Sequence, residues 1–442
     1  MSFPRYPAYK PSGVEWLGEV PGTWSIEKFR HLFEESSEKI EKEVFGDMLS
    51  VSGYRGIELK QYDDENRRRR NEDLVGYRVV RSGQLVVNTM WLNYAGLGFS
   101  ELDGYVSPAY RAYWPRTDED TKYLHYLLRS EHYVKGYTRL LTGVLPNSLQ
   151  ISRDNMMCFP VILPPKEDQL AIATFLDHET AKIDTLIAEQ QRLIELLQEK
   201  RQAVISHAVT KGLNPDAPMK DSGVEWLGEV PEHWDVAPLK HHWQVTDCKH
   251  VTAEFTQEGY PLASIKEAQG RWIDLTNAKR TTDEFYTLLT EGNRTPEPGD
   301  LVFTRNATVG EVAEVPAQIE SFALGQDVVI LKKLKGSHCS SFAWYLLRST
   351  AVSNQLECAM IGSTFRRINV EQIKAISVPI PPSHEQASIA IYLGEASDQW
   401  SKQEQDARHC VSLLQERRSA LISAAVTGQI NVRGLVSEVE AA

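Results

Sequence analysis

The densest group of potential metal ligands in the sequence lies within ten residues of its second half. It consists of His241, His242, Asp247, Cys248 and His250. Histidine, cysteine and carboxylate side chains are the usual zinc ligands, but zinc sites repeat a few short spacings, such as two cysteines separated by two to four residues. None of these spacings occurs here. We therefore interpret the group as a His-rich strand edge and expect no metal site.

Motifs of the common catalytic chemistries are also missing from the sequence. It has no Gly-rich phosphate loop with Lys and Ser/Thr, no HExxH, no CxxC and no Asn-Pro-Pro-aromatic segment of the kind that adenine methyltransferases carry. Glu58 and Lys60 after a distant acid do not define a nuclease site. The five cysteines are odd in number and scattered, which indicates reduced thiols. The sequence thus predicts no catalytic machinery.

Loop segments in both halves have side chains suited to pairing with DNA. Arginine, asparagine and threonine can hydrogen-bond base edges and phosphates. In the second half the candidates follow a predicted strand or precede Ile368, and they are Arg305, Asn306, Thr308, Ser363, Thr364, Arg366 and Arg367. The corresponding candidates in the first half are Asn88, Trp91, Asn93, Tyr94, Asn147 and Ser148. Because these residues differ, we expect the two halves to read different bases.

A run of four arginines, Arg67, Arg68, Arg69 and Arg70, could neutralise DNA phosphates. The run lies between acidic residues, so a solvated charge run is the alternative interpretation. The formal net charge of −12 counts against a nucleic-acid partner when it is averaged over the chain. A local basic surface, with acidic surface elsewhere or facing a protein partner, would reconcile the two.

An internal repeat relates the two halves of the chain. The segment SGVEWLGEVPGTW at 12–24 returns as SGVEWLGEVPEHW at 222–234, which predicts two copies of one domain. Each copy leads through Pro-x-x-Trp into an alternating segment that we expect to be a first strand. We interpret the tryptophans of the repeat as core residues. Stacking of Trp16 and Trp226 on a sugar or nucleotide is the alternative.

Two long helical segments, Pro164 to Lys211 and Pro381 to Val426, form the second part of the repeat. They match at one offset of 217 residues, so neither copy has gained or lost a residue. Apolar residues recur on a seven-residue track, which is typical of a helix packed along another helix. The predicted helix–helix seam consists of Ile183, Leu186, Leu193, Leu197, Val204, Trp400, Ala407, Leu414 and Leu421.

The predicted fold class is α+β, with two globular domains linked by two long antiparallel coiled-coil helices in a pseudo-two-fold internal repeat. Between the leading segment and the helix, the halves share a skeleton of strands and a short helix but differ in their loops. The predicted parts are a first globule at 1–162, a central helix at 163–212, a second globule at 213–379, a distal helix at 380–428 and a tail at 429–442.

The order of these motifs resembles the specificity subunit of type I restriction–modification enzymes. The matching segments are SGVEWLGEVPxxW, PGDLVFTRNATVG, GSTFRRINVEQIKAISVPIPP and the helix ending in LISAAVTG, which together cover essentially the whole chain. The resemblance implies that the globules are target recognition domains and that the helices are spacers that dock methyltransferase subunits. It also implies double-stranded DNA, two methyltransferase (modification) subunits and restriction/translocase subunits as partners. S-adenosylmethionine, ATP and Mg²⁺ are expected on those partners and no cofactor on this chain.

The resulting hypothesis is a non-catalytic reader in which each globule binds one half of a bipartite, asymmetric DNA target. The N-terminus lacks the apolar core of a signal peptide and no run of 18 apolar residues occurs, so we expect a cytoplasmic protein without a membrane segment. Two alternatives stay open. One is a protein–protein scaffold without DNA readout, and the other is a carbohydrate- or nucleotide-binding enzyme that uses the aromatic-rich globules.

Overall fold

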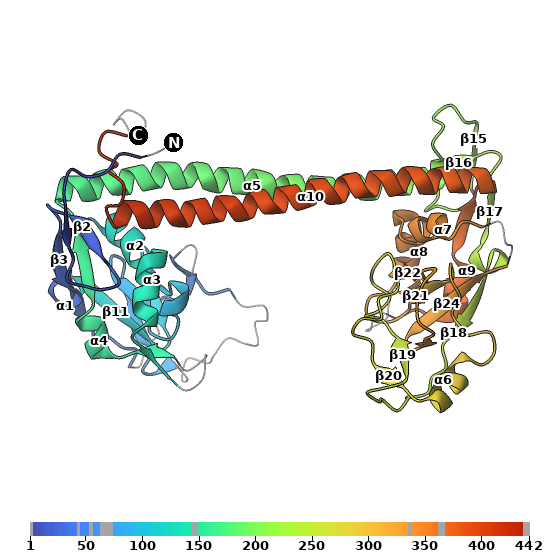
Figure 1. The fold of residues 1–442 in the computed structure, drawn as a ribbon, viewed down its shortest axis with the longest axis horizontal. Coiled ribbons are helices and arrows are strands. Elements are labelled where there is room, and N and C mark those ends of the chain that lie inside the picture. The colour runs from blue at the N-terminus through green and yellow to red at the C-terminus, as the bar shows by residue number, and fades with distance from the viewer. Residues whose placement is uncertain are drawn as a thin grey trace. The chain divides into compact units, whose positions relative to one another are not determined.

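The computed structural model describes residues 3–41, 45–52, 56–61, 74–143, 149–334, 338–360 and 367–435. The chain divides into two compact units (Figure 1). Unit 1 comprises Met1–Gln191 and His409–Ala442, and unit 2 comprises Arg192–Arg408. The division falls within the two long helices, so the domain boundaries that the sequence predicted at the helix ends stay a prediction. In the part of the chain that the structure describes, no helix is long and apolar enough to cross a membrane.

The centre of unit 1 is a four-stranded antiparallel sheet. Its strands are, in order, β4 (Phe33–Glu35), β11 (Tyr110–Pro115), β8 (Leu85–Asn88) and β9 (Leu97–Phe99). Alternate residues of β8 pack into different clusters: Leu85 and Val87 join the main core, whereas Val86 packs with residues of a second sheet. This alternation follows from the two-residue period of a strand, and it explains why the whole Leu-Val-Val run is buried.

Unit 2 has the same sheet. Its strands are, in order, β18 (Trp243–Asp247), β24 (Val328–Lys333), β21 (Leu301–Thr304) and β22 (Val312–Glu314). Leu301 and Phe303 of β21 join the main core of this unit, and Val302 joins a second cluster. Strand order, pairing and burial therefore repeat between the units, which confirms the predicted α+β fold with an internal repeat.

The other elements of unit 1 surround its central sheet. Strand β1 (Tyr9–Pro11) pairs with β2 (Glu19–Pro21), β3 (Ser25–Lys28) with β14 (Pro160–Leu163), and β12 (Leu141–Thr142) with β13 (Gln150–Ile151). The second sheet has the order β6 (Gly56–Leu59), β5 (Asp47–Ser52), β10 (Gly104–Val106) and β7 (Arg78–Val80). The short helices are α1 (Phe29–Leu32), η3 (Leu92–Tyr94), α2 (Thr121–Arg129), α3 (Glu131–Thr138) and α4 (Arg153–Met157).

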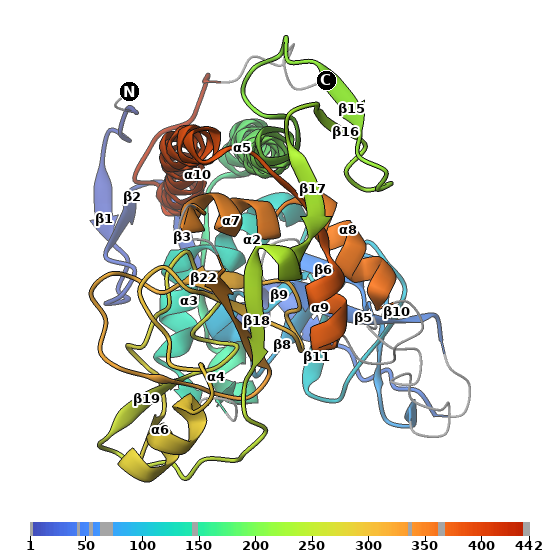
Figure 2. The ribbon, with the colours of Figure 1, turned by 90° about the vertical axis from the view of Figure 1, so that its right-hand side faces the viewer.

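Unit 2 has counterparts of most of these elements. Strand β15 (Met219–Asp221) pairs with β16 (Glu229–Pro231), and β17 (Asp235–Pro238) with β25 (Ser377–Ile380), while a smaller sheet has the order β20 (Arg280–Thr281), β19 (Tyr260–Ala263), β23 (Ala323–Leu324). Its short helices are η5 (Leu239–His241), α6 (Asp283–Thr290), α7 (Ser340–Leu347), α8 (Thr350–Ala359) and α9 (Val370–Ala375). Figure 2 shows α7 between the long helices and the sheet of this unit.

Three of the four tryptophans of the repeated leading segments belong to the core, but the core interpretation was wrong for Trp226, which is 37% exposed. Trp24 and Trp234 are fully buried. Trp16 stacks on Phe159 with ring centroids 5.4 Å apart and meets Tyr133 edge-on at 5.3 Å. Stacking of this kind fills a core and stabilises it beyond the area buried. The geometry of Trp16 therefore agrees with the core interpretation and leaves little of this ring for a ligand.

The two long helices are α5 (Lys166–Lys211) and α10 (Ser383–Val426). Within unit 1 they run antiparallel: Asp184 of α5 accepts from Arg418 of α10 at 2.9 Å, and Asp168 near the start of α5 pairs with Arg433 just beyond the end of α10. Within unit 2, Gln198 donates to Glu404 at 3.0 Å. The predicted long helices are confirmed, each beginning directly after its Pro pair.

Most predicted seam residues lie on the side of the helix that is removed from solvent. Ile183, Ala407 and Leu421 are buried, and Leu197, Val204, Trp400 and Leu414 are partly buried. The prediction was wrong for Leu186 and Leu193, which are 44% and 43% exposed. Burial instead follows Ile187, which is 7% exposed and packs in the same cluster as Leu421 and Ile422. Spacings that alternate between four and three residues carry the seam through Ile187, so Leu186 falls outside it.

Candidate nucleic-acid interface

The hairpin loop between β8 and β9 holds four of the predicted DNA-binding residues of the first half. Asn88 is buried, and its Oδ1 accepts from the Met90 N–H at 3.2 Å, so it shapes the loop. Trp91 and Tyr94 are 57% and 66% exposed, with ring centroids 5.8 Å apart. Asn93 is half-buried. The loop therefore presents two aromatic faces to solvent, and such faces suit stacking or packing in a groove.

Tight backbone geometry fixes this loop. The Trp91 carbonyl accepts from the N–H groups of Tyr94 at 3.0 Å and Gly96 at 2.9 Å. Ala95 adopts a left-handed conformation with φ of 54°. Gly96 is required because a Cβ there would lie 2.6 Å from the Trp91 carbonyl oxygen. The two exposed rings are thus held on a closed turn.

The hairpin loop between β21 and β22 occupies the equivalent place in unit 2. It contains Arg305, Asn306 and Thr308, of which Thr308 is exposed and Asn306 is half-buried. The Asn306 Oδ1 accepts from the Ala307 N–H at 2.9 Å, and Ala307 has φ of 59°. This loop therefore offers small polar groups where the first offers aromatic rings.

The structure brings the second predicted segment of each half to its hairpin loop. In unit 2, the Ile368 N–H donates to the Arg305 carbonyl at 3.0 Å, and Asn306 forms an antiparallel bridge with the exposed Arg367. In unit 1, the Ile151 N–H donates to the Thr89 carbonyl at 3.1 Å. Both pairings start from the residue that follows the central strand, Thr89 after β8 and Arg305 after β21, and reach isoleucines that the 217-residue offset of the repeat relates. The candidates Arg67, Arg68, Arg69, Arg70, Asn147, Ser148, Ser363, Thr364 and Arg366 lie outside the described residues.

Arg305 is held inside its own domain. It is 4% exposed, its Nη2 lies 3.0 Å from His250 Nε2, and its Nε lies 3.4 Å from Asp247 Oδ1. A base contact through this guanidinium would require breaking a buried ion pair, which is strongly unfavourable. The prediction that Arg305 contacts DNA is therefore not supported, because this side chain is placed to support the loop.

The same arrangement bears on the potential metal ligands. Asp247, Cys248 and His250 place their donor atoms within 4.8 Å of one another, whereas His241 is exposed and His242 packs its ring 5.2 Å from that of His338. Burial raises the pKa of the Cys248 thiol, which disfavours the thiolate that a metal needs. The Arg305 guanidinium already supplies a positive charge to this group. These residues form an anchor for Arg305.

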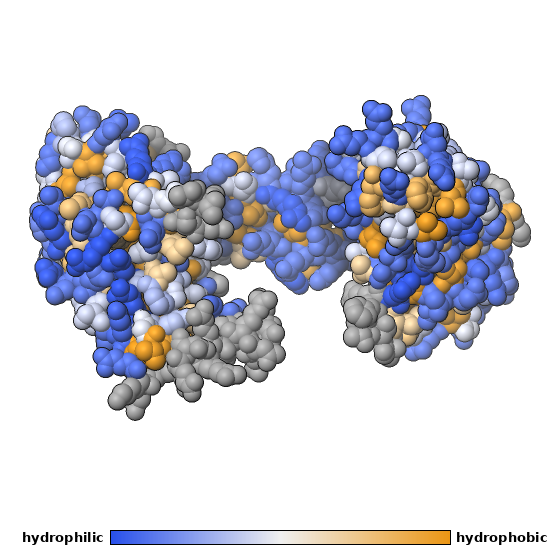
Figure 3. All heavy atoms as spheres, turned by 90° about the horizontal axis from the view of Figure 1, so that it is seen from below, coloured by the Kyte–Doolittle hydropathy of each residue, from blue (hydrophilic) through white to orange (hydrophobic). Residues whose placement is uncertain are grey.

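A cavity of about 430 Å³ opens beside the second hairpin. Its wall includes Phe255, which is 54% exposed and lies 4.2 Å from the Lys279 ammonium group, and Asp327, whose carbonyl accepts from the Arg305 N–H. The faces of the two units seen in Figure 3 are largely hydrophilic, with hydrophobic side chains in small groups. Surfaces of this character suit a hydrated, charged partner better than an extensive apolar one.

Residues 238–406, which include the second hairpin, match the family described as the type I restriction modification DNA specificity domain. The second half of the chain is thus similar to a type I DNA specificity domain. The resemblance to type I specificity subunits that the sequence motifs indicated is thereby confirmed. Related proteins extend the likeness beyond the matched residues.

Two curated relatives carry the name of specificity subunits. The putative type I restriction enzyme MjaX specificity subunit of Methanocaldococcus jannaschii is 23% identical over 316 residues, which is 70% of this chain and 68% of that protein. The EcoKI specificity subunit of Escherichia coli is 22% identical over 275 residues, which is 60% of this chain and 56% of that protein.

Two solved structures share the fold. A chain from a type I restriction–modification system studied for its assembly and conformational transition aligns with a TM-score of 0.68 at 15% identity, covering 92% of this chain and 98% of that one. The HsdS subunit of Thermoanaerobacter tengcongensis aligns with a TM-score of 0.51 at 16% identity, covering 93% and 98%. The α+β fold with long helices is therefore shared across chains of very different sequence.

Sequence reasoning missed the residues that hold the hairpin loops in place. The interpretation of Asp247 and His250 as part of a His-rich strand edge gives them no partner, whereas both contact Arg305 in the structure. The sequence analysis assigns no role to Arg129 and Arg348, which lie at the ends of two short helices. A signal was present, since both end the sequence Tyr-Leu-Leu-Arg-Ser that is repeated in the two halves.

Proposed function

We propose that this chain is the sequence-specific DNA-binding subunit of a type I restriction–modification complex. Each unit would read one half of a bipartite, asymmetric target with the hairpin loop that follows β8 or β21. The observation that supports this most is the repetition of sheet order, loop position and loop pairing with different side chains on the loops. Equivalent frames with different contact groups are what reading two different half-sites requires.

The long helices are proposed to set the unspecified spacer between the half-sites and to dock two methyltransferase subunits. A helix of 46 residues is about 70 Å long, and one turn of DNA advances roughly 34–36 Å, so the scale is compatible with two half-sites on one face of the duplex. Leu186 and Leu193, exposed on α5, are apolar groups that such a partner would cover.

The chemistry is proposed to reside on the partners. Methyltransferase subunits would bring S-adenosylmethionine and modify adenine, and restriction/translocase subunits would use ATP and Mg²⁺, in the cytoplasm. This chain would act without a cofactor and without catalytic residues of its own. Its contribution is to decide where the partners act.

Exchange of one domain tests this function. Residues 213–379 are replaced by the equivalent segment of a relative, and the chain is produced with its methyltransferase subunits. Methylation mapping should show a new sequence in one half of the target and the original sequence in the other. Alteration of both halves, or of neither, would contradict independent reading.

Salt dependence provides the control against a protein-binding scaffold. Duplex binding by the complex should weaken steeply as salt rises, because phosphate contacts release counterions. The domain-exchanged complex should keep the same salt slope while its preferred sequence changes. Absence of any salt-sensitive duplex binding would favour the scaffold alternative.

A further inference from the structure

The helices α2 and α7 end in the same sequence, Tyr-Leu-Leu-Arg-Ser, in equivalent places of the two units. Arg129 is the last residue of α2, and Arg348 is the C-cap of α7. Both side chains extend to the hairpin loop that we propose reads DNA in their own unit. Their contacts differ in chemistry but have the same target.

In unit 1, Arg129 holds the hairpin loop and the end of strand β5 through their backbone carbonyls. Its Nη1 donates to the carbonyl of Ala95 at 3.2 Å and also to the carbonyl of Leu97. Its Nη2 donates to the carbonyl of Ser52 at 3.3 Å. Ala95 and Leu97 end the loop that carries Trp91 and Tyr94. Burial and the nearby Arg418 lower the pKa of Arg129 to about 10, so the group stays charged at neutral pH. A charged donor makes stronger hydrogen bonds than a neutral one.

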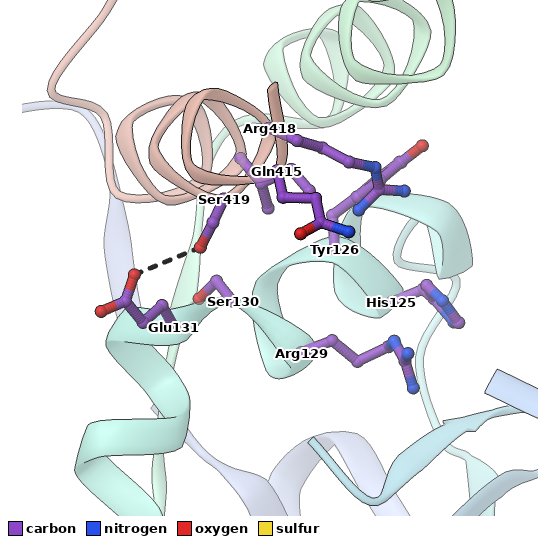
Figure 4. Close-up of a pocket in the computed structure, with 9 residues that line it drawn as sticks. His125, Tyr126, Arg129, Ser130, Glu131, Gln415, Arg418 and Ser419 are labelled. Carbon is purple, nitrogen blue, oxygen red and sulfur yellow. Dashed lines mark hydrogen bonds between the residues drawn. The ribbon is translucent and has the colours of Figure 1, made fainter. Parts of the chain in front are cut away.

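Arg129 lines a cavity of about 270 Å³ in unit 1, between α2, α3 and α10 (Figure 4). Arg129 and His125 leave α2 on the same side, while Gln415 and Arg418 come from α10. Across the same cavity, Ser419 of α10 donates to Glu131 of α3 at 3.2 Å. The arginine thus lies in a layer between the long helix and the hairpin loop.

In unit 2, Arg348 forms an ion pair with Glu311. Glu311 closes the second hairpin loop: its carbonyl accepts from the Thr304 N–H at 2.9 Å, and its N–H donates to the Thr308 carbonyl at 3.3 Å. On the other side, the carbonyl of Arg348 accepts from Gln202 of α5 at 3.1 Å. A continuous chain of contacts therefore joins α5 to the loop.

We propose that Arg129 and Arg348 are positioning residues that set the orientation of the two reading loops relative to the helix layer. The inference rests on the proposed function and deepens it. Arg129 acts through loop carbonyls, and Arg348 acts through the Glu311 carboxylate. Neither is assigned a contact with DNA. A base-reading group must be held within about 0.5 Å of its productive place, so a loosened loop loses discrimination before it loses affinity.

Charge reversal in unit 2 tests the proposal on the chain in complex with its methyltransferase subunits. Arg348→Glu and Glu311→Arg are made singly and together, and methylation is measured on duplexes with single-base changes in each half-site. Each single variant should lower discrimination in the half read by unit 2 by roughly 10-fold, and leave the other half within about 2-fold. The double variant should restore most of the discrimination. The salt slope of binding should be unchanged in all three, because no phosphate contact is removed.

A matched control is Lys374→Glu, which breaks an ion pair with Glu371 in the same unit at a side chain with the same exposure, 31%. It should leave discrimination in both halves unchanged. The complementary variant is Arg129→Lys, which should lower discrimination only in the half read by unit 1, because one ammonium group cannot span the carbonyls of the hairpin loop and of Ser52 at the end of β5. Circular dichroism shows whether each variant is folded. If a charge-reversal variant does not fold, Arg348→Gln is measured in its place.

The outcomes separate the inference from the proposed function. Absence of a bipartite preference in the wild-type complex would end the proposed function itself. A wild-type preference that survives Arg348→Glu and Arg129→Lys unchanged would overturn the positioning role alone. Equal loss in both halves, or failure of the double variant to recover, would also overturn it, since both indicate a general structural effect.

Discussion

His125 is a partly buried base beside Arg129, the arginine that holds the hairpin loop of unit 1. A Cβ at Gly56 would lie 3.1 Å from its Cε1, and a Cβ at Gly98 would lie 3.4 Å from it, so two glycines make room for the ring. Burial, together with Arg129, lowers the pKa of His125 from 6.5 to about 4. The side chain is therefore neutral in the folded protein at neutral pH.

This predicts an acid sensitivity with a defined window. The unfolded state takes up a proton on His125 near pH 6.5 and the folded state only near pH 4, so the free energy of unfolding should fall as pH drops through this interval. At about 1.4 kcal/mol per pKa unit, the loss from this group reaches roughly 3 kcal/mol. Urea unfolding of His125→Gln should show a flatter pH dependence between 4 and 6.5. His207→Gln, at an exposed position, should keep the wild-type slope.

Residue types alone predicted where the hairpin loops lie, but they did not predict which side chains of these loops are exposed and which are bound within the domain. Arg305 has a side chain that could pair with a base, but it is bound inside the domain. Its partners are Asp247, at the end of β18, and His250, which follows that strand. Trp91 and Tyr94, by contrast, stay exposed as the loop prediction required. Which polar groups neutralise one another depends on tertiary contacts, and no local pattern encodes these.

The helix seam is the feature that decides stability at the scale of secondary structure. Ile187 and Leu186 are adjacent, equally apolar and differ sixfold in exposure, 7% against 44%. Ile187→Ala should lower the free energy of unfolding by about 2–4 kcal/mol because it leaves a cavity in the packed core. Leu186→Ala should cost less than about 1 kcal/mol. Denaturant unfolding of the two variants measures the contrast, and equal losses would show that the seam has been assigned to the wrong side.

The sequence could place both long helices because Pro pairs, seven-residue recurrence and an unbroken offset all act locally along the chain. It could not choose between Leu186 and Ile187, since both flank the track of Ile183 at helical spacing. That choice depends on where α10 crosses α5. Sheet order was similarly beyond the sequence, because β11 (Tyr110–Pro115) pairs with β4 (Phe33–Glu35), and a long stretch of chain separates these two strands.

At the scale of the whole molecule, the proposal that the long helices set the spacer between the half-sites can be tested by lengthening them. Seven residues of matching heptad are inserted after Gln190 in α5, together with seven at the facing position of α10, which keeps the seam in register. The added length is about 10 Å, so the unspecified spacer should grow by roughly three base pairs while the specified bases stay the same. Methylation mapping reads both quantities. An unchanged spacer would show that the helices do not set it.

The insertion has an internal control. Seven residues added to α5 alone displace its second half against α10 and should lower stability and activity together. Equal behaviour of the single and paired insertions would indicate that the helices are not packed along one another in the working complex.

Each long helix ends against the tryptophan of a leading segment. A Cβ at Gly212, after α5, would lie 3.2 Å from Trp234, and a Cβ at Gly428, after α10, would lie 2.4 Å from Pro21 and 3.0 Å from Trp24. In unit 1 the tail also joins the first residues of the chain, with the Asn431 N–H donating to the Pro4 carbonyl at 2.8 Å. The segments around Pro4 and Asn431 therefore lie side by side within unit 1. A gene rearranged to start at residue 213, with a short linker joining the present ends, should yield a protein with unaltered target preference.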